Sequence, residues 1–449
     1  MTDVIRKKLN DYPIVRWSVL AIVSVTMMCG YFITDVMAPL QTMLEDSFGW
    51  NGTEYGFFTG AYGYFNVLLF MLIIGGIILD KKGMRFTGVL ACSLMIIGCG
   101  IKYYAVSPYF AFAGQMFGMK TQVLVASLGF AIFGVGVETA GITVTKVIAR
   151  WFKGKEIALA MGLQVATARI GTALALSVTV GLAKYFNQIS APVLMGLLLL
   201  CIGLITFLVF CVMDRRLDES IKEDNAPPEE SFKLADIGLV VRNRGFWLVA
   251  ILCVLFYSAV FPFLKFATSL MINKYGVEEE LAGLIPSMLP FGTILLTPLF
   301  GSIYDRLGKG ATIMIIGSLL LVVVHTCFAL PVMNVWWFAA IVMILLGIAF
   351  SLVPSAMWPS VPKIIPQRQL GTAYATIFWV QNIGLAGVPM LIGMVLNNYC
   401  RTGNPTQPYD YTIPMIIFAT FGALAVIVAY ILKREDRKKQ YGLEKPNIS

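Results

Sequence analysis

Residues 133–171 read FGVGVETAGITVTKVIARWFKGKEIALAMGLQVATARIG. The stretch predicts two apolar helices joined by a short basic turn at 150–155, with Glu138 in the first helix and Arg169 in the second. At about 1.5 Å of rise per residue, both charges lie roughly 18–20 Å from the turn, near the middle of a bilayer whose apolar core is about 30 Å thick. Charges at that depth are costly unless they are paired or line a wet cavity, so they mark a candidate site. A carboxylate and a guanidinium facing one pocket suit a ligand that carries an amine and a carboxylate.

The composition of the whole chain indicates a membrane protein with many spans. Of its 449 residues, 58% are hydrophobic and 13% are charged, whereas about 25% of the residues in soluble domains are charged. The net charge of +9 would fit a nucleic-acid-binding protein if the basic residues gathered on one face among aromatic residues, but they alternate with apolar stretches instead. We therefore expect the lipid bilayer as a partner and no nucleic acid.

The residue types that hold cofactors and metals do not form a recognisable pattern. The eight cysteines fit no disulfide or zinc framework, because most of them lie within apolar stretches. The tripeptide at 308–310 lacks both the earlier glycine and the following Ser or Thr of a phosphate-binding loop. The sequence therefore predicts no cofactor, no metal site and no enzymatic activity.

Hydrophobic stretches of spanning length occur twelve times along the chain. They fall at 17–40, 56–79, 87–104, 123–149, 157–183, 190–213, 246–272, 281–303, 311–330, 335–357, 370–397 and 412–432. Lys and Arg are concentrated in alternate loops, so the positive-inside rule places both termini in the cytoplasm. The prediction is an all-α membrane protein with twelve transmembrane helices.

The twelve stretches divide into two halves. Residues 1–213 form the first six-helix bundle and residues 245–434 the second, with a cytoplasmic connector at 214–244 and a cytoplasmic tail at 435–449. A glycine- and aspartate-containing loop at 76–85 recurs in the second half. Repeats of this kind predict two pseudo-symmetric bundles that rock against each other around a substrate held near the midplane.

The recurring loop resembles a signature of the major facilitator superfamily. It reads Gly-x-x-x-Asp-Lys-x-Gly-x-Arg at 76–85 and Gly-x-x-x-Asp-Arg-x-Gly at 301–308. More narrowly, the chain resembles the MFSD1-like branch, whose animal member is a lysosomal dipeptide transporter. That likeness covers most of the chain and rests on the stretches 151–156, 162–164, 168–171, 257–263, 358–359, 370–374 and 381–382. It implies the superfamily fold and a secondary transporter that works by alternating access.

The resemblance also implies roles for the two midmembrane charges. Glu138 matches the acidic residue that receives a dipeptide's amino group, and Arg169 matches the arginine that receives its carboxylate. The chain departs from the superfamily in the fourth helix, where Phe130 occupies the place of an arginine often tied to proton coupling. The proline typical of antiporter fifth helices is also missing. These departures favour a dipeptide facilitator or uniporter, and a proton-coupled symporter is kept as an alternative.

Six further side chains lie at a suitable depth or within the matched stretches, and we regard them as candidate substrate contacts. Aromatic rings can cover an apolar ligand side chain while a polar tip meets the peptide unit. The amides would bond either to the peptide unit or simply to a neighbouring helix. These candidates are Tyr62, Tyr257, Trp358, Gln164, Gln381 and Asn382.

Two groups of charged residues predict gates. Asp35 and Lys265 lie roughly 28 and 31 Å along helices one and seven, which are symmetry mates, so both are expected near the outer mouth. We predict that they form a salt bridge when the protein faces the cytoplasm; alternatively, each points at water or headgroups. A second set, from the two inner loops, is predicted to latch the inner helix ends. It consists of Asp80 with Arg85 and Asp305 with Arg306.

Other interpretations use the same charges differently. Glu138 and Arg169 could form a purely structural ion pair between neighbouring helices. In an organic-anion carrier for dicarboxylates or sugar acids, Lys146, Lys265 and Arg169 would supply positive charge and Glu138 would be neutral or paired. A receptor or scaffold has no need of opposed midmembrane charges. Short termini and tight loops favour the bacterial inner membrane, with the lysosomal membrane as the alternative. Separately, we expect a monomer.

Overall fold

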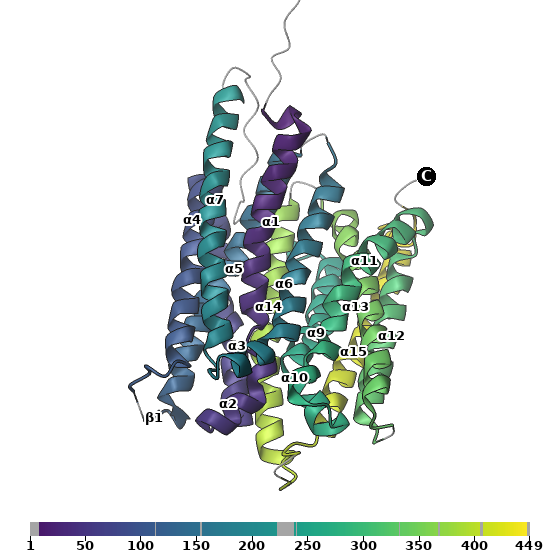
Figure 1. The fold of residues 1–449 in the computed structure, drawn as a ribbon. Helices are drawn as coiled ribbons and strands as arrows, with labels where there is room; N and C mark the ends of the chain where they lie inside the picture. The colour runs from purple at the N-terminus through teal and green to yellow at the C-terminus, as the bar shows by residue number, and fades with distance from the viewer. Residues whose placement is uncertain are drawn as a thin grey trace, which may run out of the picture.

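The computed structural model describes residues 9–112, 114–152, 155–221, 238, 240–331, 333–366, 369–404 and 407–446. Long, roughly parallel helices make up the molecule, and both ends of the described chain lie at the same end of the bundle (Figure 1). We call this the termini end and the opposite one the far end. The predicted connector between the halves lies largely outside the described residues.

The helices and strands fall into two halves. The first half contains α1 (Pro13–Asp35), α2 (Gln41–Phe48), α3 (Gly52–Leu68), α4 (Met71–Ala105), α5 (Thr121–Trp151), α6 (Ile157–Tyr185) and α7 (Ala191–Ile221). The second half contains α9 (Arg244–Tyr275), α10 (Glu279–Ala282), α11 (Leu284–Leu307), α12 (Gly310–Ala329), α13 (Trp336–Ile364), α14 (Leu370–Tyr399) and α15 (Thr412–Lys439). Short 3-10 helices occur at Leu9–Asp11 and Ala38–Leu40, and a small antiparallel hairpin joins β1 (Gln115–Met116) to β2 (Met119–Lys120).

Twelve membrane crossings follow from these elements. In the described part of the chain, eleven helical segments are long and apolar enough to span a bilayer. One of them, α4, bends at Gly83, whose φ of 80° is a conformation that favours glycine. Residues 71–82 of α4 continue from α3 as the second crossing, and the rest of α4 is the third. The predicted all-α fold of twelve helices in two bundles is confirmed.

The second crossing is broken, whereas the sequence predicted one continuous helix at 56–79. Helix α3 ends at Leu68, and Phe70 has a φ of 54°. The break frees the carbonyl of Val67 from its helical partner. Trp379 of α14 donates its indole N–H to that carbonyl at 3.2 Å, and its ring stacks on Phe70 at 5.4 Å between centroids. A break at this depth is tolerated because the other half supplies the missing donor.

Trp379→Phe keeps a ring on Phe70 but removes the only donor that we describe for the Val67 carbonyl. We expect the free energy of unfolding to fall by about 0.5–1.5 kcal/mol, the usual net contribution of one hydrogen bond, because the Val67 carbonyl is only partly buried. Thermal unfolding of the purified protein would show this as a lower Tm. Trp336→Phe, at an exposed position on α13, should leave the Tm unchanged. Equal melting of the two variants would contradict this account of the break.

Close contacts between the halves lie toward the far end. Helix α3 packs on α14, and α6 packs on α11. A Cβ atom added to Gly56 would lie 2.5 Å from the carbonyl oxygen of Pro389, and one added to Gly283 would lie 2.0 Å from that of Leu176. Glycine lets these backbones touch, because any side chain would clash. The salt bridge from Lys184 to Glu279, at 3.0 Å, also joins the halves there. The far end is therefore closed between the two bundles.

At the termini end, residues 440–446 fold back over the second half, and we call them the C-terminal strap. The amide of Gly310 donates to the strap at 2.9 Å. The Glu444 carboxylate accepts from the Thr312 amide at 3.0 Å and from its hydroxyl at 2.8 Å. Lys363 donates to two strap carbonyls at 3.1 and 3.0 Å. The strap thus connects the end of α15 to the start of α12 and to α13.

Candidate functional site

Two glycines of the stretch quoted above set the positions of α5 and α6. A Cβ atom on Gly134 would lie 2.1 Å from the carbonyl oxygen of Tyr62 on α3, and one on Gly171 would lie 2.2 Å from that of Met28 on α1. Only glycine permits such close approaches. They bring the acidic part of α5 against α3 and the basic part of α6 against α1. The local sequence therefore places the two midmembrane charges at the inner face of the first half.

Glu138 is half-buried and is contacted from both halves. The hydroxyl of Tyr62, on α3, donates to its Oε1 at 2.7 Å. Asn382, on α14 of the second half, lies near the carboxylate. Its own Nδ2 donates to the carbonyl oxygen of Phe378 at 3.0 Å, which fixes the amide on the inner face of α14. The carboxylate thus lies where the two bundles meet.

Arg169 is half-buried and lies over three aromatic rings. Its guanidinium carbon is 5.6 Å from the ring centroid of Tyr31 on α1, 5.2 Å from that of Phe261 on α9 and 5.1 Å from that of Phe350 on α13. We call these rings the aromatic cage. Each cation–π contact contributes about 0.5–2 kcal/mol and leaves the positive charge in place. The cage therefore holds the guanidinium without neutralising it.

Glu138 and Arg169 do not pair with each other. Among the ion pairs of the described residues, none joins these two side chains within 4.0 Å. The Tyr31 ring lies 5.6 Å from the Arg169 guanidinium carbon, and no described contact joins it to Glu138. The structural ion-pair alternative is therefore disfavoured. Each charge has its own uncharged partners: a tyrosine hydroxyl for Glu138 and three aromatic rings for Arg169.

Tyr257 and Trp358 line the second half beside the aromatic cage. The indole N–H of Trp358 donates to the Tyr257 hydroxyl oxygen at 3.0 Å. The Tyr257 ring stacks on Phe261 at 5.2 Å between centroids. Both residues belong to the stretches singled out in the sequence, and the structure brings them next to Arg169. Their contact with substrate remains a prediction.

The two glutamines are placed differently. Gln381 is buried and accepts a hydrogen bond from the Cys253 thiol at 3.5 Å, so its side chain joins α14 to α9 within the second half. Gln164 is half-buried on α6, in the same helix as Arg169.

The three rings of the aromatic cage were not among the candidates predicted from the sequence. Phe261 and Phe350 carried no polar signal, and Tyr31 is one of many aromatic residues at similar depth.

Asp35 and Lys265 form an ion pair between the halves. The Lys265 Nζ lies 2.5 Å from Asp35 Oδ1 and donates to the carbonyl oxygen of Thr34 at 2.6 Å. Each side chain is 11% exposed. The hydroxyl of Tyr55 donates to the Lys265 carbonyl at 2.7 Å, which adds a second link between the bundles. The role of the pair as a gate stays a prediction.

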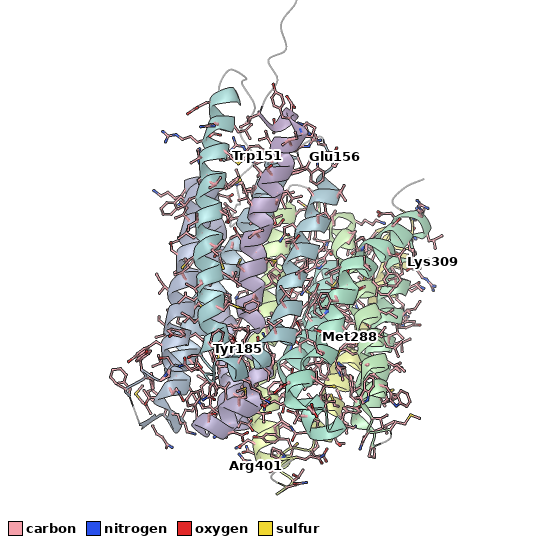
Figure 2. The ribbon with its side chains drawn as sticks, viewed as in Figure 1. Trp151, Glu156, Tyr185, Met288, Lys309 and Arg401 are labelled. Carbon is pink, nitrogen blue, oxygen red and sulfur yellow. The ribbon has the colours of Figure 1, made fainter. Side chains whose placement is uncertain are left out.

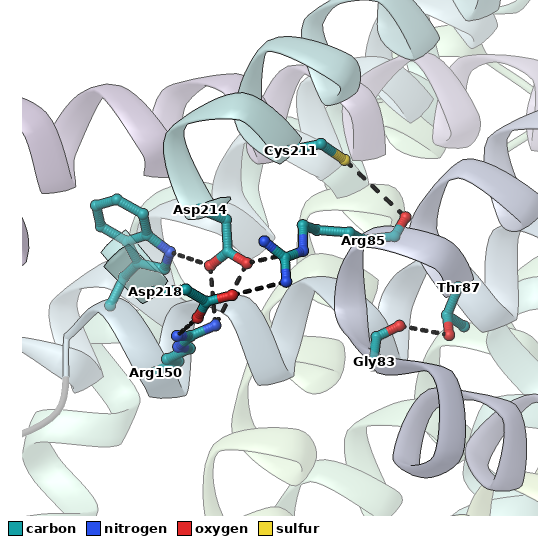
Figure 3. Close-up of polar contacts among 8 residues, drawn as sticks. Gly83, Arg85, Thr87, Arg150, Cys211, Asp214 and Asp218 are labelled. Carbon is teal, nitrogen blue, oxygen red and sulfur yellow. Dashed lines mark hydrogen bonds and ion pairs between the residues drawn. The ribbon is translucent and has the colours of Figure 1, made fainter. Parts of the chain in front are cut away.

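A cluster of charges fastens the termini end of the first half, as Figure 3 shows. Arg85 lies 2.6 Å from Asp218 and 3.7 Å from Asp214, both on α7. Arg150 pairs with the same two carboxylates, at 3.2 Å to Asp214. The indole N–H of Trp151 completes the cluster by donating to Asp214 at 3.2 Å. Arg85 therefore connects α4 to α7 and, through the carboxylates, to α5.

The remaining loop charges have varied surroundings. Asp80 pairs with Lys146 of α5 at 2.9 Å. Asp305 is half-buried and Arg306 is exposed near the end of α11. Glu156, which marks the termini end in Figure 2, pairs with Arg16 at 3.0 Å. These described pairs lie within one half, in contrast to the far-end pairs that join the halves.

Comparisons with known proteins agree with this architecture. The chain matches the sequence profile of the Major Facilitator Superfamily over residues 21–389 and 263–447. It is 28% identical over 419 residues to the lysosomal dipeptide transporter MFSD1 of Homo sapiens, covering 90% of this chain and 83% of that protein. It is 29% identical over 432 residues to the Mus musculus protein of the same name, covering 92% and 86%.

Solved transporter structures share the fold. The nucleoside transporter NupG superposes with a TM-score of 0.71 at 14% identity, covering 92% of this chain and 99% of that one. A bacterial homologue of the human lysosomal transporter Spinster, inward-facing and occupied, gives 0.68 at 12% identity, covering 93% and 97%. The relatives are transporters rather than enzymes, and the resemblance inferred from the motifs is confirmed. This chain is an integral, multi-pass membrane protein and a secondary transporter that belongs to the major facilitator superfamily.

Proposed function

We propose that this transporter carries dipeptides or similar small zwitterions by alternating access, as a facilitator. The observation that carries the proposal is the separation of Glu138 from Arg169. A zwitterion between the halves would bring its amine to Glu138 and its carboxylate to Arg169, and both contacts would be charge-assisted hydrogen bonds. The relatives named as lysosomal dipeptide transporters support the same ligand class.

Uncharged groups between the two charges suit the body of a peptide. Tyr31 stands against Arg169 and would offer its hydroxyl to the peptide unit. Tyr257 and Trp358 offer apolar ring surface with polar tips, which fits a ligand side chain. Asn382 would add an amide from the second half. A ligand held by both bundles links binding to their relative motion.

The organic-anion interpretation has less support, because the lysines that it needs have other partners. Lys146 pairs with Asp80 at 2.9 Å, and Lys265 pairs with Asp35 at 2.5 Å. Of these three cations, Arg169 is the one for which the described residues show no carboxylate partner within 4.0 Å. Facilitated transport is favoured over proton symport because the arginine of proton-coupled relatives is replaced by the apolar Phe130.

The setting of the protein is part of the proposal. The excess of Lys and Arg at the termini end supports a cytoplasmic location for both termini. Asp35 and Lys265 would then gate the outer mouth, and the closed far end corresponds to a protein that faces the cytoplasm. We propose a monomer in the bacterial inner membrane; the lysosomal membrane is the alternative that the names of the relatives support.

A ligand screen tests the substrate class. Ligands that bind only the folded protein at about 100 times their Kd should stabilise it by about 2.7 kcal/mol, which raises the Tm. We expect dipeptides to raise the Tm and dicarboxylates to leave it unchanged. N-acetyl dipeptides and dipeptide amides should both raise the Tm less than dipeptides do, because each lacks one of the two charges. Stabilisation by dicarboxylates alone would support the anion carrier instead. Dipeptide counterflow in proteoliposomes, unaffected by a pH gradient, would distinguish a facilitator from a symporter.

A further inference from the structure

Lys102 of α4 is a buried cation that the proposed site does not use. Its side chain exposes no surface. The Nζ donates to the carbonyl oxygen of Ile33 at 2.9 Å and lies 4.6 Å from the ring centroid of Phe130 and 5.4 Å from that of Phe133. Among the described residues, no carboxylate pairs with it within 4.0 Å. A buried ammonium without a counter-ion is costly, so packing alone does not account for it.

The position of Lys102 at the end of α1 points to its use. Helix α1 ends at Asp35, so its last carbonyls have no helical partners. Lys102 takes one of these carbonyls, and Lys265 takes the next, that of Thr34, at 2.6 Å. The ring of Phe130 lies near both ammonium groups, at 4.6 and 5.9 Å. Two cations therefore lie at the negative end of the α1 dipole, and one of them, Lys265, also pairs with the Asp35 carboxylate.

The two lysines differ in what happens when the far end opens. Lys265 belongs to α9 in the second half and must move away from α1. Asp35 would then lose the partner that it pairs with here, and a carboxylate left without its partner is destabilising. Lys102 belongs to the same half as α1 and stays. The Ile33 carbonyl that it now holds is only two residues from Asp35 along the chain.

We propose that Lys102 is a resident counter-ion that replaces Lys265 at Asp35 whenever the far end opens. Asp35 then has an ammonium partner in both states. The exchange lowers the free-energy difference between the two states. The inference rests on the proposed gate between Asp35 and Lys265, but it does not depend on the identity of the ligand.

Lys102→Met removes the charge and keeps most of the volume. In proteoliposomes containing the full chain, we expect dipeptide uptake to fall at least about tenfold, because the closed far end becomes strongly favoured; tenfold corresponds to about 1.4 kcal/mol. The Tm shift caused by dipeptide should be retained. Adding Asp35→Asn should restore uptake toward the level of the Asp35→Asn single variant, since a neutral amide needs no counter-ion. A merely structural lysine would not be rescued in this way.

Lys274→Met is the matched control. This lysine also donates to backbone carbonyls, those of Phe328 and Leu330, but all three lie within the second half. Its removal should leave uptake unchanged. If Lys102→Met does not fold, Lys102→Gln, which can still donate to Ile33, carries the same expectations.

A ligand-free measurement reports the conformation directly. Leu40, at the far end, is fully buried in this closed state. A membrane-impermeant maleimide should label Leu40→Cys in the otherwise unsubstituted chain, which samples the open far end, above the background of the parent protein. Labelling should fall with Lys102→Met and recover when Asp35→Asn is added. Unchanged labelling and uptake in Lys102→Met, or no recovery with Asp35→Asn, would overturn the proposal. If no dipeptide binds, the proposed substrate is wrong, while the labelling still decides the role of Lys102.

Discussion

Replacing Arg169 with methionine is expected to reduce dipeptide uptake by about 100-fold or more, since losing one partner of a desolvated charge pair costs about 2–5 kcal/mol. The aromatic cage holds the guanidinium with its charge uncompensated, so a substrate carboxylate is the group it lacks. Methionine would still fill the space between the rings. The loss should therefore appear in binding and transport rather than in folding. Uptake of a labelled dipeptide and the dipeptide-induced Tm shift would measure it.

Arg169→Lys refines the test. Lysine keeps the charge but lacks the planar fork that binds a carboxylate with two hydrogen bonds. We expect dipeptide uptake to fall to a level between those of the parent protein and Arg169→Met. The difference in affinity between dipeptides and dipeptide amides should become smaller. Arg401→Met, at an exposed position at the far end (Figure 2), is the control and should transport normally. Full uptake by Arg169→Met in a folded protein would show that this arginine does not hold the substrate.

Replacing Glu138 with glutamine should cause a loss of similar size, since it removes the charge that receives the substrate amine. The amide can still hydrogen-bond to Tyr62, so the local packing should persist. We expect the selectivity to change: the parent protein should prefer a free amino terminus, and the variant should bind free and N-acetylated dipeptides about equally. Competition against a labelled dipeptide would measure this preference.

Two companion variants make the Glu138 result specific. Tyr62→Phe removes the hydroxyl that orients the carboxylate, and a loss of about 1 kcal/mol, or roughly fivefold in affinity, is expected from one hydrogen bond. Glu156→Gln changes a carboxylate that pairs with Arg16 at the termini end and should leave the selectivity as it was. A Glu138→Gln protein that still discriminates against N-acetylated peptides would place the amine elsewhere.

The depth of the two central charges could be predicted from the sequence because it follows from helix rise alone. Counting from the turn at 150–155 put Glu138 and Arg169 at one level, and their depth in the bilayer stays a prediction. Hydropathy likewise predicted the number of crossings, since each must span the bilayer. Both predictions depend on local geometry, which the sequence specifies directly.

Features that depend on packing between segments far apart in the chain could not be predicted from the sequence. The break at Phe70 has no proline or glycine to announce it and depends on Trp379, which lies far along the chain. The ion pairs of Arg85 are with Asp214 and Asp218 on α7, whereas the sequence singled out Asp80, which is closer along the chain. The aromatic cage is drawn from helices of both halves, so no single stretch could reveal it.

The C-terminal strap limits how the molecule can deform. It ties the end of α15 to the α11–α12 junction and to α13, so the second bundle has little freedom to splay at that end. The strap therefore favours motion of the second bundle as one unit, and the glycine contacts of α3 with α14 and of α6 with α11 mark where that bundle meets the first one. The short C-terminal strap thus makes the second bundle more rigid at the termini end.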